Sequence, residues 1–478
     1  MTLRRSLAWT TGGQIVLFAA QMAAQVVVAR HLSPYLVGIS AIAFSICDML
    51  NLMQTFGLRN FLVREAAVPL PVVRTVFGVN LMVALATAGV LAGLALIGGA
   101  VWGEARVGVV LGILAVAPVV MAFELVPGAM MQREMAFGAI AAINGLRAVV
   151  SAGVTVALVL GGGSYASMGW GALAGMVAGA LATMWAGRRY LVWRPSLAAW
   201  RQVARFGLHM AGIGGASNLA QKAVDLIIGR VLGLAALGLF SRASALNNVV
   251  WGNIHVVFTR VVFAAMAEER RQTGSIRAIY LRTVDLVTAC LWPAFAGLAV
   301  LSGPVVRWLY GPGWDAAGPV LALMAVAAIG LSAVTMAWEV FVVCGATGTQ
   351  VRIEAWRAGL LPVMTVAGAM LGLRGAAAAR VVDAAVAVAL YRGAMGRLTE
   401  TRLGEVVAIW ARNAVLAGVA VAPALGVMVW ARWAPGVALA PVAGAVLAGV
   451  GLWGLAARWL NPALAGEIGW LVARVRRG

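Results

Sequence analysis

The chain has 478 residues, of which 63% are apolar and only 11% are charged. Soluble domains carry about 25% charged residues, so this composition, with a mean hydropathy of +0.94, excludes a soluble enzyme and a disordered chain. The formal net charge of +20 would suggest a nucleic-acid partner in a soluble protein. In a membrane protein the basic residues must first be placed relative to the bilayer.

A membrane-spanning helix needs about 20 mostly apolar residues, and this length predicts about fourteen spans. In chain order they are 9–29, 37–57, 76–100, 108–127, 139–160, 168–186, 208–229, 237–262, 283–302, 317–344, 356–373, 377–391, 413–431 and 437–457. The first stretch has the arginines of a signal peptide before it, but glutamines interrupt it and no clean cleavage site follows. We therefore interpret it as a transmembrane helix.

The basic residues predict the orientation of the chain. If the N-terminus is cytoplasmic, most arginines fall in the inside loops, among them Arg188, Arg189 and Arg194 in the central loop. This asymmetry predicts an even number of spans, with both termini in the cytoplasm. The net charge then comes mostly from basic residues at the cytoplasmic face, next to anionic lipid headgroups. No nucleic-acid partner is needed to explain it.

An internal repeat is visible when the chain is compared with itself at an offset of 200. The matching pairs are Arg5/Arg205, Gly12/Gly212, Gln21/Gln221, Ala23/Ala223, Arg30/Arg230, Leu32/Leu232 and Gly38/Gly238. This offset covers six helices, an even number, so the repeat is parallel. The sequence therefore predicts an all-α polytopic protein with two six-helix lobes, 1–195 and 196–397, and two extra helices in 398–478.

Polar residues line one face in each of four predicted spans. They include Gln21 in the first, Asp48 and Asn51 in the second, Lys222 and Asp225 in the seventh, and Asn248, Trp251 and His255 in the eighth. The first and second spans are equivalent to the seventh and eighth under the repeat. Such faces either line a water-filled cleft between lobes or act as polar contacts between packed helices.

The intramembrane charges carry the same two interpretations. Lys222, the single lysine of the chain, has Asp225 three residues on to offset its cost in the membrane. It is either half of a structural ion pair or a cationic contact for an anionic substrate, and Asp48 and Asp225 are the candidates for ion coupling. Arg147 has no acidic partner at helical spacing, which makes it a candidate anion contact. Arg30 and Arg230 occupy equivalent outer helix ends, where arginines also snorkel to the interface.

No catalytic or metal-binding motif is present in the sequence. The three cysteines and three histidines are scattered, and no HExxH, GxSxG or P-loop occurs. The sequence therefore predicts neither a cofactor nor a metal.

Four stretches give the chain a family resemblance. They are Ala29–Gly38 with Phe56-Gly57-Leu58, Met131–Phe137, Gly229–Gly233 with Gly238-Leu239-Phe240, and Leu309–Trp314. In this order, and with fourteen spans, the chain from Leu3 to about Arg402 resembles the Wzx-like polysaccharide-repeat-unit flippases. These belong to the multidrug/oligosaccharidyl-lipid/polysaccharide exporter superfamily.

The resemblance implies a flippase that moves a polyprenyl-diphosphate-linked oligosaccharide across the bacterial inner membrane by alternating access. Cationic donors would hold the diphosphate and polar groups the sugar. By position and type, Lys222, Arg147, Arg30 and Arg230 would serve the phosphate, and Gln21, Asn51, Asn248, Trp251 and His255 the sugar. It also implies a monomer that is surrounded by membrane lipids and has a polysaccharide polymerase and chain-length machinery as partners.

Three alternatives stay open. A cation-coupled multidrug exporter of the same superfamily needs acids in the cleft, where the sequence offers Asp48 and Asp225. A peptidoglycan-precursor flippase would act on a related lipid diphosphate. A membrane enzyme would need a large outer loop, and the predicted outer loops are short.

Overall fold

The computed structural model describes residues 18–55, 57–64, 69–198 and 200–461. Within helices, the side chains of residues 52–55, 60, 64, 202–216, 253–261 and 264 lie outside this description. Across the described ranges the chain is helical and has no β-strand. The predicted all-α class is therefore confirmed.

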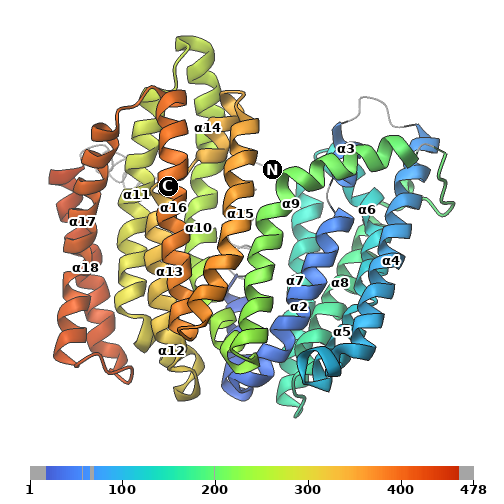
Figure 1. Ribbon diagram of the computed structural model, residues 1–478, viewed down its shortest axis with the longest axis horizontal. Coiled ribbons are helices and arrows are strands. Elements are labelled where there is room, and N and C mark those ends of the chain that lie inside the picture. Colours follow the sequence, from blue (N-terminus) through green and yellow to red (C-terminus); the bar gives the residue numbers. More distant parts are fainter. Residues whose placement is uncertain (1–17, 56, 65–68, 199, 462–478) are drawn as a thin grey trace. The chain divides into compact units, whose positions relative to one another are not determined.

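The chain forms two compact units, Met1–Gly238 and Leu239–Gly478. After a helical stretch at residues 18–31, the first unit contains α2 (Pro34–Thr55), α3 (Leu58–Arg64), α4 (Leu70–Trp102), α5 (Ala105–Leu114), α6 (Ala117–Arg133), α7 (Phe137–Leu160), α8 (Ala166–Ala186), the short η1 (Arg188–Tyr190) and α9 (Trp200–Val231) (Figure 1). Helix α9, which the repeat would place in the second lobe, packs against α2 in this unit. The lobe boundaries and the repeat stay predictions.

The second unit holds the C-terminal helices. They are α10 (Leu234–Thr273), which begins in the first unit, α11 (Arg277–Val300), α12 (Ser302–Tyr310), η2 (Pro312–Trp314), α13 (Ala317–Ser332), α14 (Ala337–Val343), α15 (Thr347–Ala369), α16 (Leu373–Thr399), α17 (Leu403–Trp430) and α18 (Leu439–Leu460). At 1.5 Å per residue, α10 is about 60 Å long, twice the thickness of a hydrocarbon core. It therefore extends well beyond the predicted span 237–262.

Among the described residues, nine helical segments are long and apolar enough to cross a membrane. The predicted spans 356–373 and 377–391, the first with an internal proline, are continuous helices, α15 and α16. Two other predicted spans are interrupted: 108–127 breaks between α5 and α6, where Pro118 opens α6, and 317–344 breaks between α13 and α14, where Met336 adopts a φ of 61°. The chain is a multi-pass membrane protein.

Helices α7 and α8 pack through a stripe of small residues. Gly171, Gly175 and Gly179 follow one another at four-residue spacing on α8. A Cβ on Gly171 would lie 1.8 Å from the Thr155 hydroxyl oxygen, and one on Gly175 would lie 2.7 Å from the Arg147 carbonyl oxygen. Without a hydrophobic drive between helices in lipid, such close backbone approach is what holds them together.

A second glycine contact joins the start of α2 to the start of α10 within the first unit. A Cβ on Gly38 would lie 1.8 Å from the Leu234 carbonyl oxygen, and a Cβ on Gly238 would lie 1.9 Å from the Pro34 carbonyl oxygen. The contact is reciprocal: each helix start presents a glycine to the first residue of the other. Gly38 and Gly238 are 200 positions apart, and so are Pro34 and Leu234, which is the offset of the predicted repeat.

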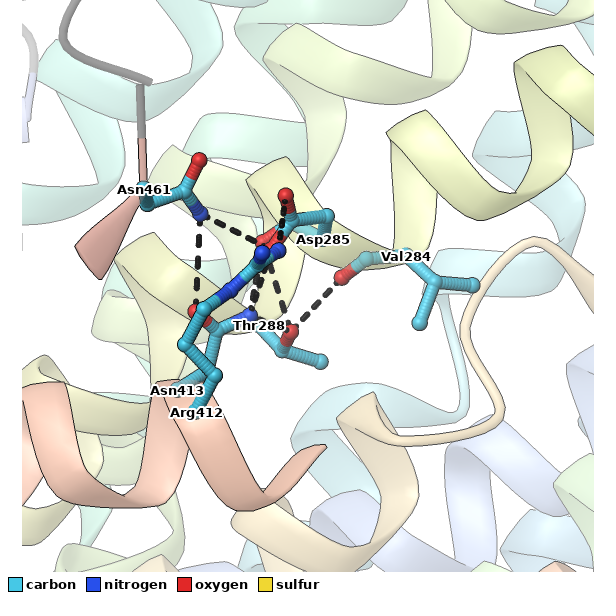
Figure 2. A network of polar contacts seen from close by, with 6 residues as sticks. All are labelled: Val284, Asp285, Thr288, Arg412, Asn413 and Asn461. Atoms are coloured by element: carbon cyan, nitrogen blue, oxygen red, sulfur yellow. Dashed lines mark hydrogen bonds and ion pairs between the residues drawn. The ribbon is translucent and has the colours of Figure 1, made fainter. Parts of the chain in front are cut away.

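In the second unit a buried polar cluster ties α17 and the end of α18 to α11 (Figure 2). Asp285 on α11 accepts hydrogen bonds from Asn413 Nδ2 (2.9 Å) and Asn461 Nδ2 (2.8 Å) at Oδ1, and pairs through Oδ2 with Arg412 Nη2 (2.6 Å). Asn413 and Asn461 are fully buried. Buried carboxylates are costly unless paired and hydrogen-bonded, and here the partners come from the two C-terminal helices.

Candidate functional site

The predicted polar faces of the second and seventh spans meet between α2 and α9. Beside the polar positions, α2 buries Ile39, Ile42 and Ile46, and α9 buries Val224 and Ile228. Ile42 packs against α9 at Gly229, so the two helices share apolar as well as polar contacts.

Two polar contacts cross between these helices. The Ser45 hydroxyl donates to Asp225 Oδ2 at 2.8 Å, and Lys222 Nζ pairs with Asp48 Oδ2 at 2.7 Å. The contacts are one turn apart on each helix, as expected for antiparallel neighbours. The sequence brings Lys222 close to Asp225, but the structure gives the lysine a carboxylate from another helix.

Exposure changes along this polar face. Ser45 is buried, whereas the side chain of Asp48 is 50% exposed and that of Lys222 is 32% exposed. Asn51, one turn further along α2, donates from Nδ2 to Cys47 Sγ at 3.3 Å. The Lys222–Asp48 pair therefore joins α2 to α9 and is still partly exposed.

Arg147 is not unpaired, as its helix alone suggests. Its Nη2 lies 2.5 Å from Glu124 Oε2 on α6, and Glu124 is 5% exposed. Gly179 on α8 leaves room for the guanidinium, because a Cβ there would lie 2.4 Å from Arg147 Nε. The expectation of an unpaired arginine was wrong, since a partner on the neighbouring helix α6 has no signature in spacing along α7.

The remaining predicted residues of the first unit lie at the surface. Arg30, at the end of the 18–31 helix, and Arg230, one residue before the end of α9, are exposed, as is Gln21. A long arginine side chain at a helix end can snorkel to a membrane interface.

The predicted residues of α10 belong to the second unit. Asn248 is exposed, and Trp251 is half-buried with its ring 6.0 Å from that of Phe295. His255 lies in the helix, but its side chain is outside the described residues. The structure thus brings together Lys222, Asp48, Asp225 and Asn51, and their substrate roles stay predictions, as do those of the other predicted residues.

Sequence reasoning missed a second charged cluster, between α15 and α16. Arg357 donates two hydrogen bonds to Asp383, from Nε to Oδ1 at 3.2 Å and from Nη2 to Oδ2 at 2.9 Å. Its Nη1 also lies 3.0 Å from Glu354 Oε1. Tyr391 donates to the same glutamate. The partner of Asp383 is on the neighbouring helix α15, so the spacing of charges along α16 does not indicate it.

Another missed cluster lies between spans at the start of α5. The Tyr35 hydroxyl donates to Glu104, which also accepts from the Arg106 backbone N–H at 3.2 Å. These two hydrogen bonds, that from Tyr35 first, lower the pKa of Glu104 below its ordinary value.

No group of three or more metal-ligating side chains occurs among the described residues. A profile of the family described as "Polysaccharide biosynthesis protein" matches residues 27–319, more than half of the chain. The chain belongs to this family. The matched range includes α2 and α9, which carry the Lys222–Asp48 pair.

Individual relatives agree with this assignment. The lipopolysaccharide biosynthesis protein WzxC of Escherichia coli (strain K12) is 22% identical over 322 residues, which cover 66% of this chain and 65% of WzxC. The amylovoran biosynthesis protein AmsL of Erwinia amylovora is 25% identical over 136 residues, 28% of this chain and 35% of AmsL. The chain matches less than two thirds of the length of either relative. The resemblance to Wzx-like flippases is confirmed.

Solved structures show the same fold. The lipid II flippase MurJ, in an inward closed conformation, superposes with a TM-score of 0.77 over 96% of this chain and 100% of MurJ, at 11% identity. An inward-facing multidrug resistance MATE family transporter of the MOP superfamily gives a TM-score of 0.61 over 80% of this chain and 96% of its own, at 16% identity. At these identities the likeness establishes the fold alone.

Proposed function

We propose that the protein flips a polyprenyl-diphosphate-linked oligosaccharide repeat unit across the bacterial inner membrane, by alternating access of two lobes. The observation that carries this proposal is the half-exposed Lys222–Asp48 pair between α2 and α9. Charged side chains within a membrane are costly, and they commonly mark a substrate or ion pathway. A lysine there can bind the diphosphate, which is the anionic part of a polyprenyl-diphosphate-linked oligosaccharide. The family of polysaccharide biosynthesis proteins supports the substrate class.

The pair suggests an exchange of counterions. Without substrate, Asp48 neutralises Lys222 at 2.7 Å. A diphosphate oxygen that reaches Lys222 replaces Asp48, and the released carboxylate becomes available to a cation. The charge in the site therefore stays balanced through the cycle, which keeps the desolvation cost low in both states.

Asp225 has a positioning role in this proposal. It accepts from the buried Ser45 hydroxyl and so holds α9 against α2 one turn from the ion pair. Asn51 and Gln21 would contact the sugar, and so would Asn248, Trp251 and His255 from α10. Arg30 and Arg230 would attract the anionic headgroup at the helix ends.

The test is complementation of a deletion strain, in which extracted polyprenyl-linked sugars are identified by mass and surface polysaccharide is measured. Lys222→Ala removes a charge-assisted contact, so flipping should fall about 10-fold or more at normal protein abundance. Lys222→Arg should retain part of the activity. Arg374→Ala, which changes an exposed arginine at the start of α16, is the matched control and should flip normally.

The outcomes distinguish the functions. Accumulated lipid-linked repeat units with lost surface polymer support the proposal, and a polymerase that consumes the flipped unit is then the expected partner. Accumulated peptidoglycan precursor, or unchanged polysaccharide with new sensitivity to cationic dyes, contradicts it. Full activity of Lys222→Ala removes the ion-pair mechanism.

A further inference from the structure

A groove in the second unit lies outside the site described above. Helices α15 and α16 come into backbone contact at Gly368 and Gly375, where a Cβ on Gly368 would lie 2.4 Å from the Gly375 carbonyl oxygen. Further along both helices they leave a groove of about 840 Å³. Its lining is Arg352, Ala355, Trp356, Gly359, Leu360, Val363, Val386 and Leu390.

The lining combines an apolar channel with one charged end. All lining side chains are apolar except Arg352, which begins the row on α15. Gly359 forms the floor, where an added Cβ would meet no atom within 4 Å. Trp356 and Val363 flank the groove and are 72% and 64% exposed, so the groove is open along its length.

The charge at the mouth of the groove is not neutralised by its neighbours. Arg357, five residues further along α15, is held by Asp383 and Glu354. Arg352 is exposed and forms no ion pair with the part of the chain that the structure describes. The mouth therefore offers one free guanidinium to an anion.

The length of the groove indicates what it holds. From Arg352 to Val363 it follows α15 for about 16 Å at 1.5 Å per residue, close to half of the roughly 30 Å hydrocarbon core. A chain that starts at a headgroup beside Arg352 thus ends near the middle of the bilayer. This is the reach of one acyl chain of a single leaflet, and it is short for a polyprenyl tail.

We infer that this groove binds an anionic phospholipid, with the phosphate at Arg352 and one acyl chain between α15 and α16. The guanidinium supplies charge and hydrogen-bond donors for phosphate oxygens, and the small residues Ala355 and Gly359 give the chain room against the helix backbone. The site is complete within the second unit and does not depend on the proposed flippase function.

The experiment is native mass spectrometry of the purified full-length protein with phosphatidylglycerol or phosphatidylcholine. The wild-type protein should retain phosphatidylglycerol preferentially. Arg352→Ala should reduce its retention about fivefold, the effect of one basic residue near the membrane surface, with little change for phosphatidylcholine. Gly359→Leu, which fills the open floor, should reduce retention of both lipids.

Matched controls change the same residue types elsewhere on these helices. Arg374→Ala removes an exposed arginine from the other end of α16, and Gly393→Leu fills open space on α16 outside the groove. Both should retain lipid like the wild type. Retention unchanged in Arg352→Ala and Gly359→Leu overturns the proposal. Displacement of phosphatidylglycerol by undecaprenyl phosphate at equal concentration overturns the choice of occupant.

Discussion

Arg147 shows how much the role of one charged residue depends on a partner from another helix. Its guanidinium and the buried carboxylate of Glu124 neutralise each other inside the first unit. An anion contact would have to break this pair and leave Glu124 uncompensated. The geometry therefore favours a structural role for Arg147 over the substrate contact predicted from its position.

A double-mutant cycle tests this interpretation. Arg147→Met alone should destabilise the protein by about 3 kcal/mol, because it leaves a buried carboxylate unpaired, and Arg147→Met/Glu124→Leu should recover most of the loss. The measurements are thermal stability in detergent and abundance in the membrane. A double variant that is stable but inactive in flipping would instead assign Arg147 to the substrate.

From the sequence, the site could be predicted only to the extent that residue spacing shows which side chains share one face of a helix. The 3.6-residue period placed Asp48 and Asn51 on one face of α2, and Lys222 and Asp225 on one face of α9. Which acid pairs with which base depends on how neighbouring helices pack. The residue spacing along one helix does not show the register between two helices. For the same reason Glu124 and the Arg357 cluster were missed, although the four-residue spacing of glycines on α8 was a readable packing signal.

At the scale of the element, helix existence and order follow from hydropathy, whereas helix breaks do not. The apolar lengths predicted α4, α7, α8, α17 and α18 because a bilayer requires continuous apolar helices. The breaks before α6 and before α14 depend on local backbone conformations within apolar runs, so hydropathy does not register them. The length of α10 was underestimated because its polar end still forms a helix outside the apolar window.

The crossing of α2 and α10 gives a prediction at this scale. Gly38→Ala would place a methyl carbon 1.8 Å from the Leu234 carbonyl oxygen, and Gly238→Ala one 1.9 Å from the Pro34 carbonyl oxygen. Backbone cannot yield as a flexible side chain does, so each variant should lose about 2 kcal/mol or more of stability. Thermal unfolding in detergent measures this loss.

Gly93→Ala on α4 is the control, because a Cβ there meets no atom within 4 Å. It should be as stable as the wild type or slightly more stable, since alanine favours the helix. Equal stability of Gly38→Ala and Gly93→Ala would show that the two helix starts are not in tight contact.

For the whole molecule, the arginine asymmetry predicts the orientation in the membrane. Arg194→Cys, in the exposed loop before α9, should react with a membrane-impermeant maleimide only after the cells are permeabilised. Gly313→Cys, exposed between α12 and α13, should react in intact cells. The parent protein sets the background, since Cys47 is buried and Cys290 and Cys344 are partly covered. The reverse labelling pattern would invert the predicted topology.

The cluster around Asp285 also has a consequence for biogenesis. Asp285 is inserted with α11, but its partners Arg412, Asn413 and Asn461 emerge from the ribosome about 130 to 180 residues later, roughly 6 to 35 s at ordinary synthesis rates. During that interval the nascent chain carries an intramembrane carboxylate without these partners. An unfinished chain thus differs chemically from a finished one, and a membrane protease or chaperone that recognises exposed intramembrane charge would discriminate between them.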